Sequence, residues 1–190
     1  MIAVTPLGYA LLGLMRGAPQ TGYGLRMVFE TTPLGNYSSS PGSIYPALKT
    51  LLKAGLAETR RKGGDGRGGE LYYLTPAGEA AFETWLCLPV TLEEVQKRLP
   101  VIMLRFAFLT GHPDRKLTLD LLASLEAAAR DQVRQLETFL AGDFASAMPL
   151  QSRLAVGQGV ASTRSVADWA ADARRQLIEA AHNAPNGETI

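Results

Sequence analysis

Hydroxyl and amine side chains gather on one side of a short predicted helix over residues 43–54. Apolar residues recur there with helical spacing, so we expect one face of the helix to be buried. The expected inward positions are Ile44, Ala47, Leu48, Leu51 and Leu52. The remaining positions are Ser43, Tyr45, Pro46, Lys49, Thr50 and Lys53. Hydroxyls and amines in this arrangement suit phosphates and base edges in a DNA major groove, although a solvated helix face has the same composition.

A second basic cluster lies in a glycine-rich stretch between two predicted strands. It holds four cations and one acid, giving 4 − 1 = +3 between residues 60 and 67. The cations are Arg60, Arg61, Lys62 and Arg67. Such a hairpin can lie along a phosphate backbone or place one arginine in a minor groove, or it can be a solvated turn.

Other motifs give no support for catalysis. Residues 64–69 match G-x-G-x-x-G, but a strand follows them instead of the helix that a dinucleotide site needs. His112 and His182 have no partners at metal-ligand spacing, and Cys87 is expected to be a small buried hydrophobe. We therefore expect no enzyme, no metal site and no cofactor.

Two tryptophans have two interpretations. Trp85 and Trp169 fit packing in a core or a dimer interface, which is the usual role of large aromatic side chains. The alternative is that they form an aromatic wall for a flat effector molecule.

The elements that position these residues follow a recognisable order. Predicted helices span residues 5–16, 21–31 and 43–54, with Thr5 as an N-cap and Gly55 as a C-terminal stop. A β-hairpin follows, and a fourth helix restarts at Thr75-Pro76. This order predicts a mainly α fold with a small β-hairpin, in the form of a winged helix-turn-helix.

The second half of the chain is rich in alanine and leucine. Its apolar patterns predict helices over residues 92–110, with a kink at Pro100, over 114–140 and over 150–181. We place the domain boundary after residue 86, giving domains 1–86 and 87–190. Long helices with apolar stripes need a partner, so we expect the second domain to dimerise.

Composition sets limits on the kind of partner. The 190 residues carry 19 basic and 18 acidic side chains, a net charge of +1, which excludes a protein that coats polyanions indiscriminately. Residues 1–86 carry 8 − 6 = +2, and residues 87–190 carry 11 − 12 = −1. A single cysteine excludes an internal disulfide, and no apolar run is long enough to cross a bilayer. We expect a soluble cytoplasmic protein.

Three motifs resemble the PadR family of transcriptional regulators. The first is Leu7–Leu14 followed by Gly22-Tyr23-Gly24-Leu25. The second is Ser40-Pro41-Gly42-Ser43-Ile44-Tyr45-Pro46-Ala47-Leu48, which continues to Ala54-Gly55-Leu56. The third is Tyr72–Gly78. Together they cover about the first 86 residues, and the helical remainder is similar to the dimerisation region of the family.

The resemblance implies a homodimeric regulator, most often a repressor of a nearby promoter, that binds a pseudo-palindromic operator in double-stranded DNA. The resemblance and the basic hairpin together indicate a set of DNA-binding residues. They are Tyr23, Ser40, Ser43, Tyr45, Lys49, Arg60, Arg61, Lys62 and Arg67. Some relatives bind phenolic acids or flat hydrophobic drugs, but no residue here matches a defined effector motif. The rival hypothesis is a winged-helix module for protein interaction and oligomerisation, without sequence-specific DNA binding.

Overall fold

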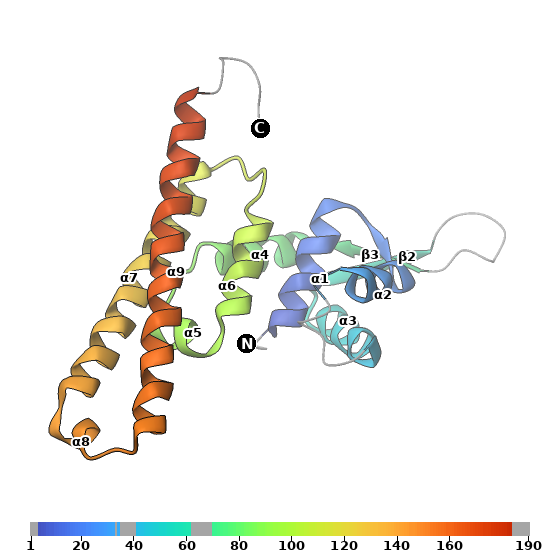
Figure 1. Ribbon diagram of the computed structural model, residues 1–190. Helices are drawn as coiled ribbons and strands as arrows, with labels where there is room; N and C mark the ends of the chain where they lie inside the picture. Colours follow the sequence, from blue (N-terminus) through green and yellow to red (C-terminus); the bar gives the residue numbers. More distant parts are fainter. Residues whose placement is uncertain (1–3, 33, 35–40, 62–69, 184–190) are drawn as a thin grey trace. The chain divides into compact units, whose positions relative to one another are not determined.

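The computed structural model of the chain describes residues 4–32, 34, 41–61 and 70–183. The chain divides into two compact units, residues 1–86 and 87–190, and each has its own buried core (Figure 1).

The first unit has the element order expected from the sequence. Its helices are α1 (Pro6–Gly17), α2 (Gly22–Thr31), α3 (Ile44–Lys53) and α4 (Pro76–Leu86). Its strands are β1 (Gln20–Thr21), β2 (Ala57–Arg61) and β3 (Glu70–Leu74), and a short 3₁₀ turn, η2 (Pro41–Ser43), precedes α3. Three helices, a β-hairpin and a fourth helix confirm the predicted mainly α class with a winged helix-turn-helix.

Local signals set the helix ends. The Thr5 hydroxyl accepts a hydrogen bond from the Gly8 amide at 3.1 Å, and the Thr21 hydroxyl accepts one from the Gly24 amide at 2.9 Å. These N-caps satisfy amides that have no partner inside the helix. Gly55 ends α3 with a positive φ of 69°, a conformation that glycine adopts without strain.

The sheet contains one strand more than the sequence predicts. Its order is β1-β3-β2, with all pairs antiparallel. Tyr72 of β3 lies between Thr59 of β2 and Gln20 of β1 in the register. The two-residue β1 therefore joins the start of α2 to the hairpin.

The second unit is helical and is built around two long helices. Its elements are α5 (Leu92–Lys97), α6 (Leu99–Phe108), α7 (Arg115–Ala141), α8 (Asp143–Ser146) and α9 (Leu150–Asn183). Helices α7 and α9 lie side by side (Figure 1).

Ion pairs connect α7 and α9. Glu126 pairs with Arg174 at 3.1 Å, and Glu137 pairs with Arg164. Later residues of α7 meet earlier residues of α9, so the two helices run antiparallel.

The predicted helix over residues 92–110 is in fact two helices. Helix α5 ends at Lys97, and Arg98 leaves the helical region with φ −139° and ψ 27° before α6 begins. Pro100 has no amide hydrogen for a helical bond, and it is tolerated only in a first turn. The proline therefore starts a helix here instead of bending one.

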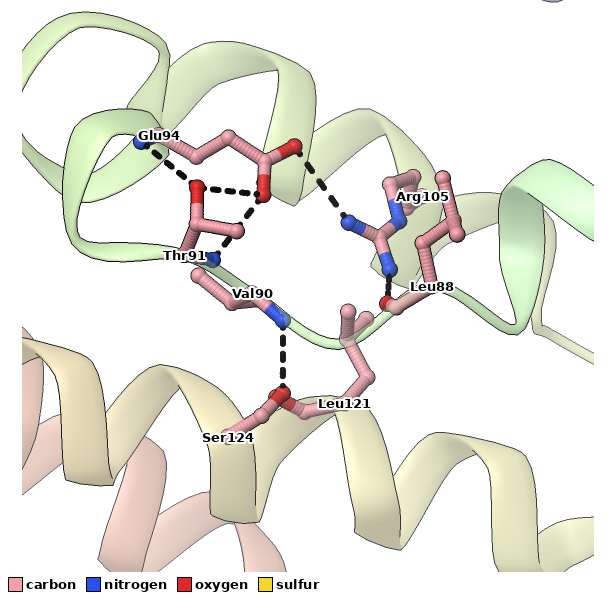
Figure 2. A network of polar contacts seen from close by, with 7 residues as sticks. All are labelled: Leu88, Val90, Thr91, Glu94, Arg105, Leu121 and Ser124. Carbon is pink, nitrogen blue, oxygen red and sulfur yellow. Dashed lines mark hydrogen bonds and ion pairs between the residues drawn. The ribbon is translucent and has the colours of Figure 1, made fainter.

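Three polar contacts fasten the segment 88–91 to the helices of the second unit (Figure 2). The Arg105 guanidinium donates to the Leu88 carbonyl and lies 3.6 Å from a Glu94 carboxylate oxygen. The Val90 amide donates to the Ser124 hydroxyl at 3.0 Å, and Thr91 and Glu94 form a capping box at the start of α5. The Arg105 side chain is fully buried, and burial lowers its pKa, an effect that Glu94 opposes.

Cys87, the first residue of the second unit, is exposed, so the prediction that it is a buried hydrophobe is wrong. It lies just beyond the end of α4, where the chain no longer follows a buried helix face. No helix in the described part of the chain combines the length and the apolar character that crossing a membrane needs.

Candidate nucleic-acid interface

Helix α3 presents the polar face expected of a recognition helix. Ile44, Leu48 and Leu51 are buried, whereas Tyr45 and Lys49 are exposed and lie one helical turn apart. Pro46 stands in the first turn, where its missing amide hydrogen has no cost. The Thr50 hydroxyl donates to the Pro46 carbonyl at 3.0 Å, so it is already used within the helix.

Two positions predicted to face inward are only partly buried. Ala47 and Leu52 have intermediate exposure, because the buried face of this ten-residue helix is narrower than the apolar pattern suggests. Ser43 precedes the helix in an α-helical conformation and makes no side-chain capping bond to it.

Helix α2 carries a second exposed tyrosine. Leu25 and Phe29 bury one side of the helix, while Tyr23 in its first turn is 61% exposed. The Arg26 guanidinium lies 5.6 Å from the centre of the Tyr23 ring and pairs with Glu30 at 3.1 Å. Sequence reasoning did not single out Arg26, although its place three residues after Tyr23 puts the two on one face.

The two basic residues at the end of β2 differ in their contacts. Arg60 donates twice to a Glu58 carboxylate oxygen, at 2.9 and 2.5 Å, and its guanidinium lies 4.7 Å from the centre of the Tyr73 ring. Arg61 is exposed. The other predicted contacts Ser40, Lys62 and Arg67 lie outside the described residues.

Ion pairing inside the first unit leaves its positive charge in one region. Arg16 pairs with Glu79 and Glu83, Arg26 with Glu30, and Arg60 with Glu58. Among the described cations of the first unit, three have no ion pair with a described residue. They are Lys49 and Lys53 of α3 and Arg61 of β2. In this unit, the described cations left for an external anion therefore lie on α3 and the hairpin.

The two tryptophans lie in different units and have different surroundings. Trp85 is buried in the first unit and stacks on Tyr9, with ring centres 4.4 Å apart. Trp169 of α9 is 40% exposed, and its ring meets the ring of Phe106 edge-on at 5.6 Å. Trp85 is therefore a packing residue in this unit, while Trp169 keeps a solvent-facing edge.

The titratable side chains do not assemble into a metal centre. Across the described ranges, no three His, Cys, Asp or Glu side chains come together in a way that could hold a metal ion. Burial raises the pKa of Tyr9 in the core of the first unit.

Comparisons with known proteins agree with the family resemblance. Residues 11–84 match the model of the transcriptional regulator PadR-like family. No curated protein matches the chain.

Several solved structures resemble the chain. Bacillus subtilis PadR in complex with operator DNA is 24% identical, with 90% of this chain and 98% of that chain covered and a TM-score of 0.41. The same protein in complex with p-coumaric acid is 21% identical, with coverages of 93% and 98% and a TM-score of 0.40. The Vibrio cholerae virulence activator AphA is 18% identical, with coverages of 91% and 98% and a TM-score of 0.40.

Proposed function

Residues 11–84 are a domain of the PadR-like family of transcriptional regulators, and from that premise we propose that this chain is a dimeric, sequence-specific DNA-binding repressor. The family is one of regulators and not of enzymes. Helix α3 would enter the major groove of each half of a pseudo-palindromic operator, and the β2–β3 hairpin would contact flanking phosphates.

This proposal rests on the positions of the unpaired cations in the first unit. Lys49, Lys53 and Arg61 are the cations of the described first unit that no described acid neutralises. Attraction to phosphate supplies most of the sequence-independent affinity for DNA. Tyr23 of α2 and Tyr45 of α3 are exposed as well, and tyrosine hydroxyls suit contacts to phosphates and base edges.

Dimerisation would come from the second unit. Large apolar side chains remain exposed on α8 and α9, among them Phe144 at 73%, Leu154 at 63% and Leu150 at 61%. Such exposure is typical of an interaction surface, and a second copy of the chain is the partner that a palindromic operator requires. Sedimentation velocity over a concentration series should show a dimer, and a monomer throughout would contradict this part.

An effector could bind in the second unit. A groove of about 390 Å³ lies among its helices, and no charged side chain lines it. The lining residues are Val95, Gln96, Leu99, Gln132, Leu136, Gly159, Ser162, Thr163 and Val166. This lining suits a flat, uncharged hydrophobic compound.

The groove also gives a spectroscopic test. Trp169 follows Val166 by three residues on α9, which places the indole near the groove. In a Trp85→Phe variant, planar aromatic compounds should quench the remaining tryptophan fluorescence and weaken DNA binding. No quenching across a broad panel would contradict an effector at this place.

The main experiment reverses the unpaired charges. Lys49→Glu with Arg61→Glu should abolish the gel shift of the gene's own upstream DNA, because two attractive phosphate contacts per protomer become repulsive. A matched control, Lys97→Glu with Arg153→Glu, makes the same charge change at exposed positions of the second unit and should leave binding nearly unchanged. Equal affinity of both double variants would contradict the proposed interface.

A further inference from the structure

The ring of Tyr45 lies directly against the backbone at the start of α2. A Cβ atom placed on Gly22 would lie 2.9 Å from Cε1 and 3.7 Å from Cδ1 of Tyr45. The same atom would lie 3.5 Å from Cε2 of Tyr72. The space that Gly22 leaves empty is therefore filled by the edges of two tyrosine rings.

Backbone geometry does not explain the glycine at this position. Among the described glycines only Gly55 and Gly111 have positive φ, so the conformation of Gly22 is open to any residue. Gly22 is the first residue of α2 and is buried. A side chain here would require the Tyr45 ring to shift, because real Cβ contacts below 3.0 Å are essentially never seen.

The contact joins the elements that face DNA in the proposed function. Gly22 belongs to α2, Tyr45 to the recognition helix α3, and Tyr72 to strand β3 of the hairpin. The rings of Tyr45 and Tyr72 both border the space beside Gly22. The pKa of Tyr72 is raised, mainly by burial and further by Glu70 and Tyr45. Tyr45 nevertheless remains 48% exposed, so part of its ring still faces outward.

We propose that Gly22 is a positioning residue for DNA recognition, which seats the Tyr45 ring against α2 and Tyr72 and so fixes where the Tyr45 hydroxyl meets the DNA. The inference rests on the proposed function. A methyl group on Gly22 would approach Cε1 of Tyr45 to 2.9 Å, so the ring must shift from the position it holds here. The residue acts through Tyr45 and does not itself touch DNA.

The substitution Gly22→Ala tests this without breaking the fold. Alanine is a better helix former than glycine and lowers the entropy of the unfolded chain, which offsets the displacement of an exposed ring. Its matched control is Gly17→Ala in α1, where an added Cβ meets nothing within 4 Å. Both variants should keep a melting temperature near that of the parent protein.

Affinity for the gene's upstream duplex should separate the two variants. We expect Gly22→Ala to raise Kd roughly tenfold or more, in line with the loss of one well-placed contact, while Gly17→Ala leaves Kd unchanged. An unchanged Kd for Gly22→Ala would overturn the proposal.

A double-mutant cycle shows whether Gly22 acts through Tyr45. In a Tyr45→Ala background the ring is gone, so Gly22→Ala should cause no further loss of affinity. If Gly22→Ala alone folds poorly, Tyr45→Ala should restore its melting temperature, because it removes the clashing ring. An equal loss in both backgrounds would overturn the inference.

Failure of the inference can be told apart from failure of the proposed function. If Lys49→Glu with Arg61→Glu abolishes binding but Tyr45→Ala and Gly22→Ala do not weaken it, the proposed DNA interface is supported and the proposed role of Gly22 is wrong. If the parent protein does not bind the upstream duplex at all, the proposed function and the role of Gly22 are both wrong.

Discussion

At the scale of single residues, Gly78 shows how closely two segments of the first unit approach. It lies in the first turn of α4, where its amide donates to the Thr75 hydroxyl at 3.0 Å. A Cβ atom on it would lie 2.0 Å from the carbonyl oxygen of Leu56 and 2.7 Å from Cδ1 of Leu74. The nearest obstacle is backbone, which cannot rotate away as the end of a side chain can.

We predict that Gly78→Ala destabilises the protein strongly. The added methyl group must push apart α4 and the segment that enters β2, a case of overpacking that costs about 3 kcal/mol. Urea unfolding followed by circular dichroism would measure the change in the free energy of unfolding. Gly17→Ala again serves as the control and should be neutral or slightly stabilising, and equal stabilities of the two variants would contradict the close approach seen here.

Residues also show where inference from sequence succeeds. The N-cap Thr5 and the stop at Gly55 were predicted, because each depends on neighbours within a few positions. The contact of Tyr45 with Gly22 and Tyr72 was not predicted. These three residues are distant in the sequence, and only the tertiary fold brings them together.

At the scale of elements, polar contacts hold the segment 88–91 to helices of the second unit. Arg105 interrupts an apolar run in the sequence, and such a residue is usually expected at the surface. In the structure it is buried and bonded to the Leu88 carbonyl, 17 positions away, with Glu94 close by (Figure 2). The partners of this arginine depend on the tertiary fold, so the spacing of residues in the sequence does not predict them.

We predict that Arg105→Ala destabilises the second unit by about 3 kcal/mol. The change leaves the part-buried Leu88 carbonyl without its donor and opens a cavity where the buried side chain was. Chemical denaturation at fixed protein concentration would measure it, since any self-association adds to the apparent stability. Lys97→Ala removes an exposed cation that pairs with Glu93 at 3.3 Å, and it should change stability by less than about 0.5 kcal/mol.

Helix boundaries in this unit were predicted to different degrees. The helix predicted over 114–140 is observed as α7, because its heptad-like stripe and the N-cap Asp114 are both local signals. The single helix predicted over 92–110 was wrong, because the capping box of α5 and the proline of α6 each begin a separate helix.

At the scale of the whole molecule, the net charge of +1 is small, and the positions of the unpaired cations matter more for binding an anion. In the described first unit most acids pair with arginines, as in the pairs of Arg16 with Glu79 and Glu83. Intermolecular attraction is thereby left to a few cations, which a dimer presents twice.

We predict a moderate and measurable salt dependence of DNA binding. The logarithm of the affinity should fall linearly with the logarithm of salt concentration, and Arg61→Gln should lower the slope by about 1 for each protomer that loses a phosphate contact. Fluorescence anisotropy over a salt series would give both slopes. A protein-interaction module would show no such binding to DNA, so a flat or absent response would favour that alternative.

The exposed Cys87 has a practical consequence for measuring motion. It is the chain's one cysteine and stands at the first residue of the second unit, just after α4. A nitroxide attached to its thiol would give a single labelled position per protomer, with no other thiol to remove. In a dimer, pulsed electron paramagnetic resonance would then report the spacing of the two boundaries, with and without operator DNA, as a distribution of distances.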